Sequence, residues 1–370
     1  MPDLPLLFVW DNLGPTHDDR LRAAAAAGFD VTAIQFSHAS DTYSWEAEVA
    51  VDYRVVTLNA AGERPSFAAQ VWRLFQAVRR HPARHVFLCH YGLPTMTCAI
   101  LLRLFTGKRL FAMMNSKFDD LPRVLRREVA KSLFLRPYHG AMTSSLRSRE
   151  YLAFLGVDRA RMVFGYNTID TKRLREHVAA TLPQVPPFEQ RDFIIVARLV
   201  PKKNIAAALE AFAEFNRRYP GARRLRILGD GPLEAELRAQ ADRLGIADLV
   251  EFAGFLQTRE VGQAMACSLA LILPSVEEQF GFVINEALAL GLPVICTVNA
   301  GASDILVDNL VNGVLINPHD PRTIAAGMEL MHADPEKHAR MSQAALASAD
   351  RGDTQLFAKG LRDLVEARES

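Results

Sequence analysis

Residues 274–295 read PSVEEQFGFVINEALALGLPVI, a loop, a helix and a strand. The preceding residues 269–275 (LALILPS) predict a buried strand, so the loop follows the carboxyl end of that strand. Ligands of parallel α/β sheets bind at this edge. Gly281 allows close approach of the backbone, and a helix that begins near Phe282 directs free N–H groups and a positive dipole end to the same place. We therefore expect an anion site suited to a phosphate.

Two carboxylates lie on either side of this turn. Glu286 is about one turn inside the expected helix, where a carboxylate can accept two hydrogen bonds from a vicinal diol such as a ribose. Glu278 precedes the helix and could reach the hydroxyls of another sugar, so the pair would flank a diphosphate. The alternative is one helix-terminal charge and one surface glutamate.

Cations and glycines follow two other expected strands of the same half. Arg198 and Lys203, in VARLVPKKNI (196–205), would neutralise a diphosphate leaving group, or else be two solvated surface cations. Gly229, in LGDGPLEAEL (228–237), fits either a role in shaping a cleft or a purely structural one. The third glycine of a dinucleotide fingerprint and the Walker A pattern are both absent.

The rest of the chain alternates short apolar strands with amphipathic helices, which is typical of parallel α/β sheets. With 370 residues, 49% of them hydrophobic, we expect a folded chain with two or three domains. The expected strands are 4–10, 29–36, 85–89, 109–114, 140–144, 161–165, 192–197, 223–229, 248–254, 269–275 and 292–297. Three prolines in residues 174–190 predict a linker. After residues 312–320 the pattern fades into helices at 320–333, 335–350 and 354–368.

Charge is distributed unevenly along the chain. Residues 1–175 carry 24 Lys and Arg against 16 Asp and Glu, a net charge of +8, whereas the remainder carries −7. An anionic membrane or an acidic acceptor could meet the first half, or the surface charge simply varies between domains. The four cysteines stand singly, without metal or redox spacing, and read as buried and reduced. No signal peptide or membrane-spanning segment is expected.

The first half repeats the logic of strand, glycine turn and helix at Gly14, in VWDNLGPTHDDRL (9–21). His17 lies in the first helical turn and could meet a substrate. The adjacent Asp18 and Asp19 could instead match the helix dipole.

Together these segments resemble glycosyltransferase family four, whose fold is GT-B. RLVPKKN, LGDGP, FAGF, the stretch 274–295 and NGVLI stand in the family's order and spacing over roughly residues 190–330, and the glutamates match its E-x7-E signature. YNTID (166–170) resembles the family's N-G-V-D segment, with Thr168 for the glycine. The resemblance implies two Rossmann-like, doubly wound parallel-sheet domains facing a central cleft. We expect an acceptor-binding domain over 1–175, a linker over 176–190, a nucleotide-sugar-binding domain over 191–350, and a C-terminal helix, 351–370, that could pack back on the first domain.

The resemblance also implies roles for individual residues. Glu286 would hold the ribose, and Glu278 the hydroxyls of the donated sugar. Arg198 and Lys203 would bind the diphosphate. Further donor contacts would come from the backbone of Phe280, Gly281 and Phe282, from the strand end at 252–255, which includes Phe255, and from Gly14 and Gly229.

The sequence departs from the family at two places in the first half. The family often has a histidine after a strand near the donated sugar, and here that position holds Asn115, which cannot shuttle a proton at neutral pH. His90 follows a neighbouring strand and is a candidate cleft residue or a strand cap. Lys117 lies in the polar loop SKFDDLPR, which suggests acceptor recognition, or capping of the next helix by Asp119 and Asp120.

The expected activity is transfer of a sugar from a nucleotide sugar, UDP- or GDP-linked, to a saccharide or lipid-linked acceptor in bacterial surface polysaccharide assembly. The family is largely retaining, and no D-x-D triplet suggests a metal site, so we expect no metal or other cofactor. No nucleic-acid partner is expected. A sugar-nucleotide 2-epimerase and a non-catalytic nucleotide-sugar-binding subunit are the alternatives.

Residues 121–140 (LPRVLRREVAKSLFLRPYHG) predict a basic amphipathic helix. Such a helix can bind anionic lipid, or it can face the core with a solvated basic surface. The expected location is therefore the cytoplasm, with a peripheral place on the inner face of the cytoplasmic membrane as a further option.

Overall fold

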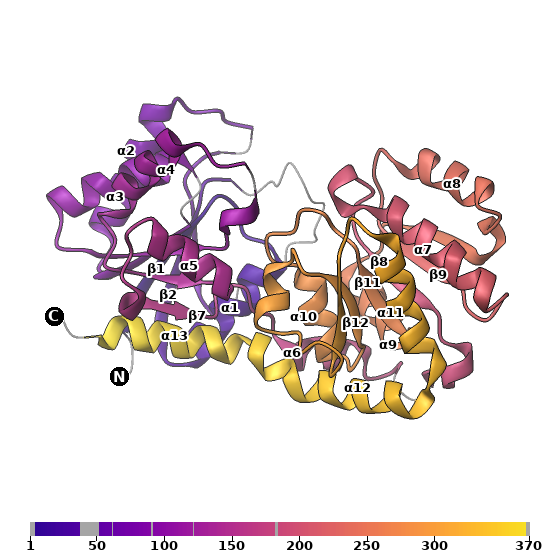
Figure 1. Ribbon diagram of the computed structural model, residues 1–370. Coiled ribbons are helices and arrows are strands. Elements are labelled where there is room, and N and C mark those ends of the chain that lie inside the picture. Colours follow the sequence, from indigo (N-terminus) through magenta and orange to yellow (C-terminus); the bar gives the residue numbers. More distant parts are fainter. Residues whose placement is uncertain are drawn as a thin grey trace. The chain divides into compact units, whose positions relative to one another are not determined.

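The computed structural model describes residues 4–37, 52–60, 62–89, 92–120, 122–181 and 184–367 (Figure 1). The chain forms two compact units, of which the first is Met1–Asp170 with Asp353–Ser370 and the second is Thr171–Gly352. Each unit contains one parallel α/β sheet, as the sequence predicts.

The first unit has a seven-stranded parallel sheet in the order β3-β2-β1-β4-β5-β6-β7. Its strands are β1 Leu4–Trp10, β2 Phe29–Gln35, β3 Arg54–Thr57, β4 His85–Cys89, β5 Arg109–Met114, β6 Gly140–Thr143 and β7 Met162–Phe164. Its helices are α1 Pro15–Ala26, α2 Phe67–Arg80, α3 Leu93–Phe105, α4 Leu125–Leu135, α5 Leu146–Phe154 and α13 Thr354–Glu366, with short 3-10 turns at η1 Phe118–Asp120 and η2 Arg159–Arg161.

Strand β1 shows why this sheet is buried on both faces. Phe8 and Trp10 pack in one apolar cluster with Phe87 and Phe357, whereas Val9 packs in another with residues of α2 and α3. Alternate side chains of a strand point to opposite faces, so a continuous apolar run requires helices on both sides. The order reverses between β1 and β4, which makes this the switch point of a doubly wound sheet.

The second unit has a six-stranded parallel sheet in the order β10-β9-β8-β11-β12-β13. Its strands are β8 Phe193–Val196, β9 Leu225–Leu228, β10 Val250–Gly254, β11 Ala270–Leu273, β12 Val294–Thr297 and β13 Gly313–Ile316. Its helices are α6 Thr171–Val178, α7 Ile205–Arg218, α8 Glu234–Arg243, α9 Thr258–Ala266, α10 Phe282–Ala289, α11 Pro321–Ala333 and α12 Pro335–Ser348. The short 3-10 turns are η4 Phe188–Gln190, η5 Pro201–Lys203, η6 Ala247–Leu249, η7 Gly301–Asp304 and η8 Ala349–Gly352.

Two strands were not expected. The edge strand β3 has only two consecutive apolar residues, Val55 and Val56, and both are exposed. Such a short apolar run does not stand out in the sequence. Strand β13 lies within residues 312–320, the segment after which the pattern was expected to fade, and it was not named among the expected strands. Its pairing with β12 aligns Gly313 with Val294, and a Cβ at Gly313 would lie 2.7 Å from the Val294 carbonyl oxygen.

The units divide at Asp170 and at Gly352, not within the expected linker at residues 176–190. Helix α6 belongs to the second unit because it packs against α9 and α10, where Arg175 Nε donates to the Ala289 carbonyl at 2.8 Å. The C-terminal helix α13 belongs to the first unit and packs on α1 and β7.

Candidate active site

In the second unit the structure brings most of the expected donor residues to one edge of the sheet. Arg198 and Lys203 follow β8, Gly229 follows β9, and Phe255 follows β10. Glu278 follows β11, the neighbour of β8 on its other side. Because all these strands are parallel, their carboxyl ends form a single edge, and the order reverses between β8 and β11.

An ion pair forms the centre of this edge. Lys203 Nζ donates to Glu278 Oε2, which also accepts from Ser275 Oγ at 3.3 Å. The two charged side chains are 16% and 14% exposed, so they are largely withdrawn from water yet reachable by a ligand. The two residues lie 75 positions apart, and only the pairing of β8 with β11 brings them together. A carboxylate and an amine held here can each be recruited by a polar ligand.

Gly281 lies directly beside this pair. Its φ of 93° is in the left-handed region, and a Cβ would lie 3.2 Å from Leu273 and 3.4 Å from Cγ of Glu278. Helix α10 begins at the next residue, so its first free N–H groups lie at the same edge as the Lys203 amine. Phe280 is buried and meets Phe282 edge to face at 5.4 Å, which fixes the backbone around the glycine.

Backbone contacts hold the loop that carries the cations. The Leu199 N–H donates to the Asp230 carbonyl at 2.7 Å, and the Val276 N–H donates to the Lys202 carbonyl at 2.9 Å. Gly229 has a φ of 129°, and a Cβ there would lie 2.1 Å from the Ala197 carbonyl oxygen. This contact gives Gly229 a structural reason to be glycine, the second of its two expected roles.

The remaining donor candidates surround this centre. Arg198 and Glu286 are half-buried, the latter in the second turn of α10. Phe255 is 47% exposed just after β10. A half-exposed ring at a strand end is available to stack on a base.

In the first unit, Gly14 and His17 form a closed turn at the start of α1. The Gly14 N–H donates to His17 Nδ1 at 3.0 Å, and the imidazole lies 5.0 Å from the Trp10 ring. Burial, and then the charge of Arg20, lower the pKa of His17, so the ring is neutral and carries its proton on Nε2. Asp18 instead receives hydrogen bonds from Arg22 and Tyr53, at 2.7 Å each.

Beneath this turn lies a group that the sequence did not single out. Arg20 is 1% exposed and donates to the Tyr166 carbonyl and, at 2.8 Å, to the Thr16 carbonyl. Its guanidinium also lies 5.0 Å from the centre of the Tyr166 ring. Arg20 thereby fixes the YNTID segment against the start of α1.

Two buried polar atoms at the same edge of the first unit were also missed. Within the described ranges, Ser144 Oγ and Asn167 Nδ2 have no hydrogen-bond partner, although these residues are only 2% and 4% exposed. They follow β6 and β7, at the carboxyl ends of the strands. Buried polar groups are normally paired, so these two atoms are candidates for contact with a ligand or water. In the sequence, the polar residues that follow the two strands, in TSS (143–145) and YNTID (166–170), could have indicated these two candidates.

The polar loop after β5 is held by its own contacts. Lys117 is 1% exposed, its amine pairs with Asp120, and its backbone N–H donates to Asp120 Oδ2 at 2.7 Å. Direct contact between Lys117 and an acceptor would require this loop to open, whereas Asn115 is half-buried at the strand end. The prediction that Asp119 and Asp120 cap α4 is wrong. Val124 is the N-cap residue, and Asp120 instead accepts a hydrogen bond within its own turn. His90 lies outside the described residues.

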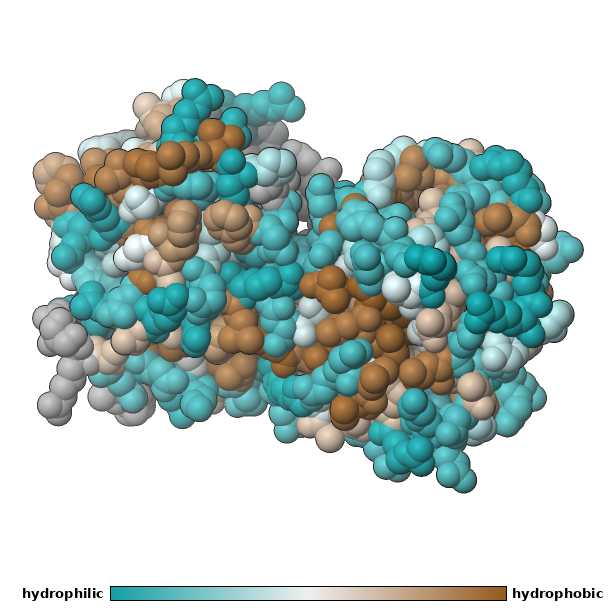
Figure 2. Space-filling view, in the orientation of Figure 1, coloured by the Kyte–Doolittle hydropathy of each residue, from teal (hydrophilic) through white to brown (hydrophobic). Residues whose placement is uncertain are grey.

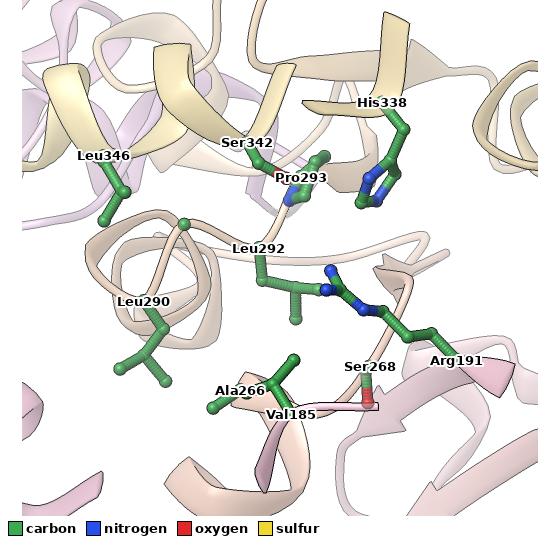
Figure 3. A pocket seen from close by; sticks show the side chains of 11 residues that line it. Val185, Arg191, Ala266, Ser268, Leu290, Leu292, Pro293, His338, Ser342 and Leu346 are labelled. Carbon is green, nitrogen blue, oxygen red and sulfur yellow. The ribbon is translucent and has the colours of Figure 1, made fainter. Parts of the chain in front are cut away.

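A pocket of about 200 Å³ lies elsewhere in the second unit (Figure 3). Ser268 and Pro293, which line it, precede β11 and β12, so it lies at the amino ends of the strands, opposite the ion pair. Its His338 ring shares a hydrogen bond of 2.7 Å with the Leu269 carbonyl, and Arg191 donates to the Pro186 carbonyl. These groups serve packing, and the pocket is not part of the candidate site.

The described ranges contain no cluster of three or more His, Cys, Asp or Glu suited to a metal ion. They also contain no helix long and apolar enough to cross a membrane.

Two doubly wound units, with the ligand edge of the second formed by β8, β11 and α10, define the GT-B fold. Comparison with solved structures supports this. The Anabaena HepE structure in complex with UDP superposes with a TM-score of 0.74 at 17% identity, covering 99% of this chain and 100% of that one. The structure of WaaG, a glycosyltransferase involved in lipopolysaccharide biosynthesis, gives 0.70 at 16% identity over 98% of this chain and 100% of that one. At such identities the likeness concerns the fold.

Residues 182–347 match the model of the family described as Glycosyl transferases group 1. Among curated proteins, the "Putative colanic acid biosynthesis glycosyltransferase WcaL" of Escherichia coli K12 is 28% identical over 249 residues, which are 65% of this chain and 59% of the relative. A D-inositol 3-phosphate glycosyltransferase of Segniliparus rotundus is 32% identical over 45% of this chain and 37% of its own length. The chain thus covers about three fifths or less of these relatives.

Proposed function

We propose that the chain is a retaining glycosyltransferase that moves a sugar from a UDP- or GDP-sugar to a saccharide or lipid-linked acceptor. The observation that carries the proposal is the Lys203–Glu278 pair beside Gly281 and the start of α10. This arrangement offers a cation and free backbone N–H groups to a diphosphate, and a carboxylate to the hydroxyls of a sugar attached to it.

In this proposal the donor separates the pair. Lys203 and Arg198 turn to the diphosphate, and Glu278 accepts hydrogen bonds from the donated sugar. Glu286 accepts from the ribose hydroxyls. Negative charge grows on the departing phosphate as the glycosidic bond breaks, and the two cations with the α10 N-terminus stabilise it. No metal ion is then required, and full activity in the presence of EDTA is the expected result.

Retention is proposed to follow from departure and attack on the same face of the sugar. The leaving phosphate oxygen takes the proton of the acceptor hydroxyl as the new glycosidic bond forms. Asn115 stands at the position where the family often has a histidine. Its amide can hold a sugar hydroxyl by hydrogen bonds without exchanging a proton. Net inversion at the anomeric carbon of the product would contradict this step.

The comparisons support the substrate class by analogy. The names of two similar proteins refer to colanic acid and lipopolysaccharide biosynthesis, and HepE was also solved with UDP and glucose. From these we infer a role in bacterial surface polysaccharide assembly.

The test is a calorimetric titration of the purified chain with UDP, GDP and ADP, repeated on Arg198→Ala/Lys203→Ala. The expected result is binding of UDP or GDP by the wild type, with a loss of about 100-fold or more in the double variant, since each of the two hydrogen bonds to a charged group contributes about 1.5–3 kcal/mol. If the wild type binds none of the three, the donor site as described does not exist.

A non-catalytic nucleotide-sugar-binding subunit is the second candidate, and Asn115 favours it because an amide, unlike a histidine at this position, cannot act as a general base. Such a subunit would bind the same nucleotide in the titration. It would not hydrolyse the nucleotide sugar, and it would not transfer the sugar to any acceptor in a cell extract. The proposed enzyme would transfer the sugar, or at least hydrolyse the nucleotide sugar slowly.

A further inference from the structure

Helix α4 is oriented opposite to what its sequence pattern predicts. Leu125, Val129 and Leu133 recur at every fourth position, which in a globular protein normally marks the face that packs on the core. Here these side chains are 77%, 53% and 50% exposed, and the buried residues of the helix are Glu128 and Leu135. The expected option of a core-facing apolar side with a solvated basic surface is therefore wrong.

A polar network holds α4 in this orientation. Glu128 is 5% exposed, accepts from the Tyr151 hydroxyl at 2.6 Å and pairs with Lys131 at 2.9 Å. Lys131 also donates to the Tyr151 hydroxyl, and the Arg123 guanidinium stacks over the same ring at 4.4 Å. Polar contacts beneath the helix thus leave its apolar side free to face outward.

The exposed apolar surface extends beyond α4. Leu104 and Phe105, at the end of α3, are 68% and 69% exposed. The two helices contact each other, and Arg103 shares a hydrogen bond of 2.8 Å with His139, just after α4. Figure 2 shows a brown band over the part of the first unit where Figure 1 labels α3 and α4. We call the set Leu104, Phe105, Leu125, Val129 and Leu133 the α4 face.

Cations border the α4 face. At about 100° per residue, Arg126 and Arg136 lie within about 60° of the centre of the α4 stripe, whereas Arg127 points roughly 160° away. All three are exposed, and none takes part in an ion pair among the described residues. The sequence from 85 to 118 contains no acid, and the sole acid from 121 to 140 is the buried Glu128.

We propose that the α4 face binds the surface of an anionic lipid bilayer. Exposed leucine and phenylalanine side chains bordered by arginines, with no exposed acid on the helix, match the acyl chains and anionic headgroups of such a surface. A second copy of the chain fits less well, because a two-fold interface would place the same arginines opposite each other. The first unit as a whole carries 24 Lys and Arg against 20 Asp and Glu, so the local arrangement matters more than net charge.

The test is co-sedimentation of the full chain at low salt with vesicles of phosphatidylcholine alone, or of equal parts of phosphatidylcholine and phosphatidylglycerol. The wild type should sediment with the anionic vesicles and stay in the supernatant with the neutral ones. Arg126→Glu should weaken the partition by about 30-fold, because reversing one charge near the surface changes two charge units of about 1 kcal/mol each. Leu125→Ser/Val129→Ser should weaken it as much or more.

Two matched variants serve as controls. Arg127→Glu makes the same charge change on the same helix, pointing away from the face, and should weaken binding less than Arg126→Glu. Arg217→Glu, on exposed α7 surface of the second unit, should bind as the wild type does. Tryptophan fluorescence and nucleotide titration confirm folding, and lipid binding is read separately from nucleotide binding, so failure of the proposed function leaves this test intact.

Failure of the wild type to sediment with anionic vesicles overturns the proposal. The proposal is also overturned if Arg126→Glu and Leu125→Ser/Val129→Ser both bind anionic vesicles as strongly as the wild type does. A dimer by light scattering that Leu125→Ser/Val129→Ser converts to a monomer, without lipid binding, would assign the α4 face to contact between copies instead.

Discussion

At the scale of single residues, the ion pair of Lys203 and Glu278 explains how a carboxylate can lie next to the proposed phosphate site. Each charge neutralises the other while no ligand is bound, which limits the electrostatic cost of holding both away from water. The strand ends predicted from the sequence placed both residues at one edge. Their direct contact could not be predicted, because it depends on the side-chain conformations of two separate loops.

Replacing Glu278 by glutamine should separate transfer from nucleotide binding. The change removes the charge that is proposed to hold the sugar hydroxyls, so we expect kcat/KM for transfer to fall by about 10- to 100-fold. Affinity for UDP or GDP should hold or rise, because Lys203 becomes free to pair with the diphosphate. Glu277→Gln, at the exposed neighbouring position, is the control and should change neither. Equal loss of nucleotide affinity and transfer in Glu278→Gln would show that the carboxylate acts on the structure of the loop.

Gly229 offers a second prediction at this scale. An alanine Cβ would overlap the Ala197 carbonyl in addition to adopting a left-handed φ, so Gly229→Ala should lower the free energy of unfolding by about 2 kcal/mol or more. Gly245→Ala, with a φ of 69° and open space around the Cβ, should lose only about 1 kcal/mol. Urea unfolding followed by far-ultraviolet circular dichroism measures both. Equal losses would mean that φ, and not the contact with Ala197, requires the glycine.

At the scale of elements, helix α4 shows a limit of pattern reading. Its spacing predicted an amphipathic helix correctly within 121–140, although the helix covers only Leu125–Leu135. The sequence could not say which side of it is buried. The buried side is determined by Tyr151, on α5, because its hydroxyl donates a hydrogen bond to Glu128 and so holds the polar side of α4 against the rest of the unit.

The network under α4 predicts a pH dependence for the first unit. Burial acts to raise the pKa of Glu128, but the hydrogen bonds from Tyr151 and Lys131 outweigh it, and the pKa lies below its ordinary value of 4.5. A lowered carboxyl pKa stabilises the fold above the unfolded value, and this contribution is lost as the pH falls through the folded value. The difference in unfolding free energy between wild type and Glu128→Gln should therefore be largest near neutral pH and shrink below pH 4.5.

Urea unfolding at a series of pH values, followed by tryptophan fluorescence, measures this difference. The control is Glu366→Gln, at an exposed carboxylate of α13, for which the difference from wild type should stay small at every pH. A difference for Glu128→Gln that did not change with pH would show that the charge of Glu128 contributes nothing to stability.

At the scale of the whole molecule, the first unit is built from both ends of the chain. Phe357 and Leu361 of α13 are 0% exposed and share an apolar cluster with Phe8 and Trp10 of β1. The sequence predicted the helix at 354–368, and its place against β1 depends on contacts between residues about 350 positions apart. Core contacts of this kind determine which unit a terminal segment joins.

Phe357→Ala should therefore destabilise the first unit by about 3–5 kcal/mol. Trp10 and Trp72 belong to this unit, and the third tryptophan of the chain, Trp45, lies outside the described residues, so the urea transition seen by tryptophan fluorescence should shift to lower concentration. Phe212→Ala removes an equally buried ring from the second unit and should shift the circular dichroism transition without shifting the fluorescence. If Phe357→Ala left the fluorescence transition unchanged, α13 would not be part of the first unit in solution.

The sequence by itself determined the α/β class, most strands, and the edge of the second sheet at which Arg198, Lys203, Glu278 and Gly281 lie. It could do so because apolar runs, glycine turns and helix starts are local signals, and parallel strands bring all their carboxyl ends to one edge. Only the tertiary structure decided the contact between Lys203 and Glu278, the burial of Lys117, the outward apolar side of α4 and the unit to which α6 and α13 belong. Each of these depends on a partner distant in sequence or on a side-chain direction, and such information exists only once the elements have packed.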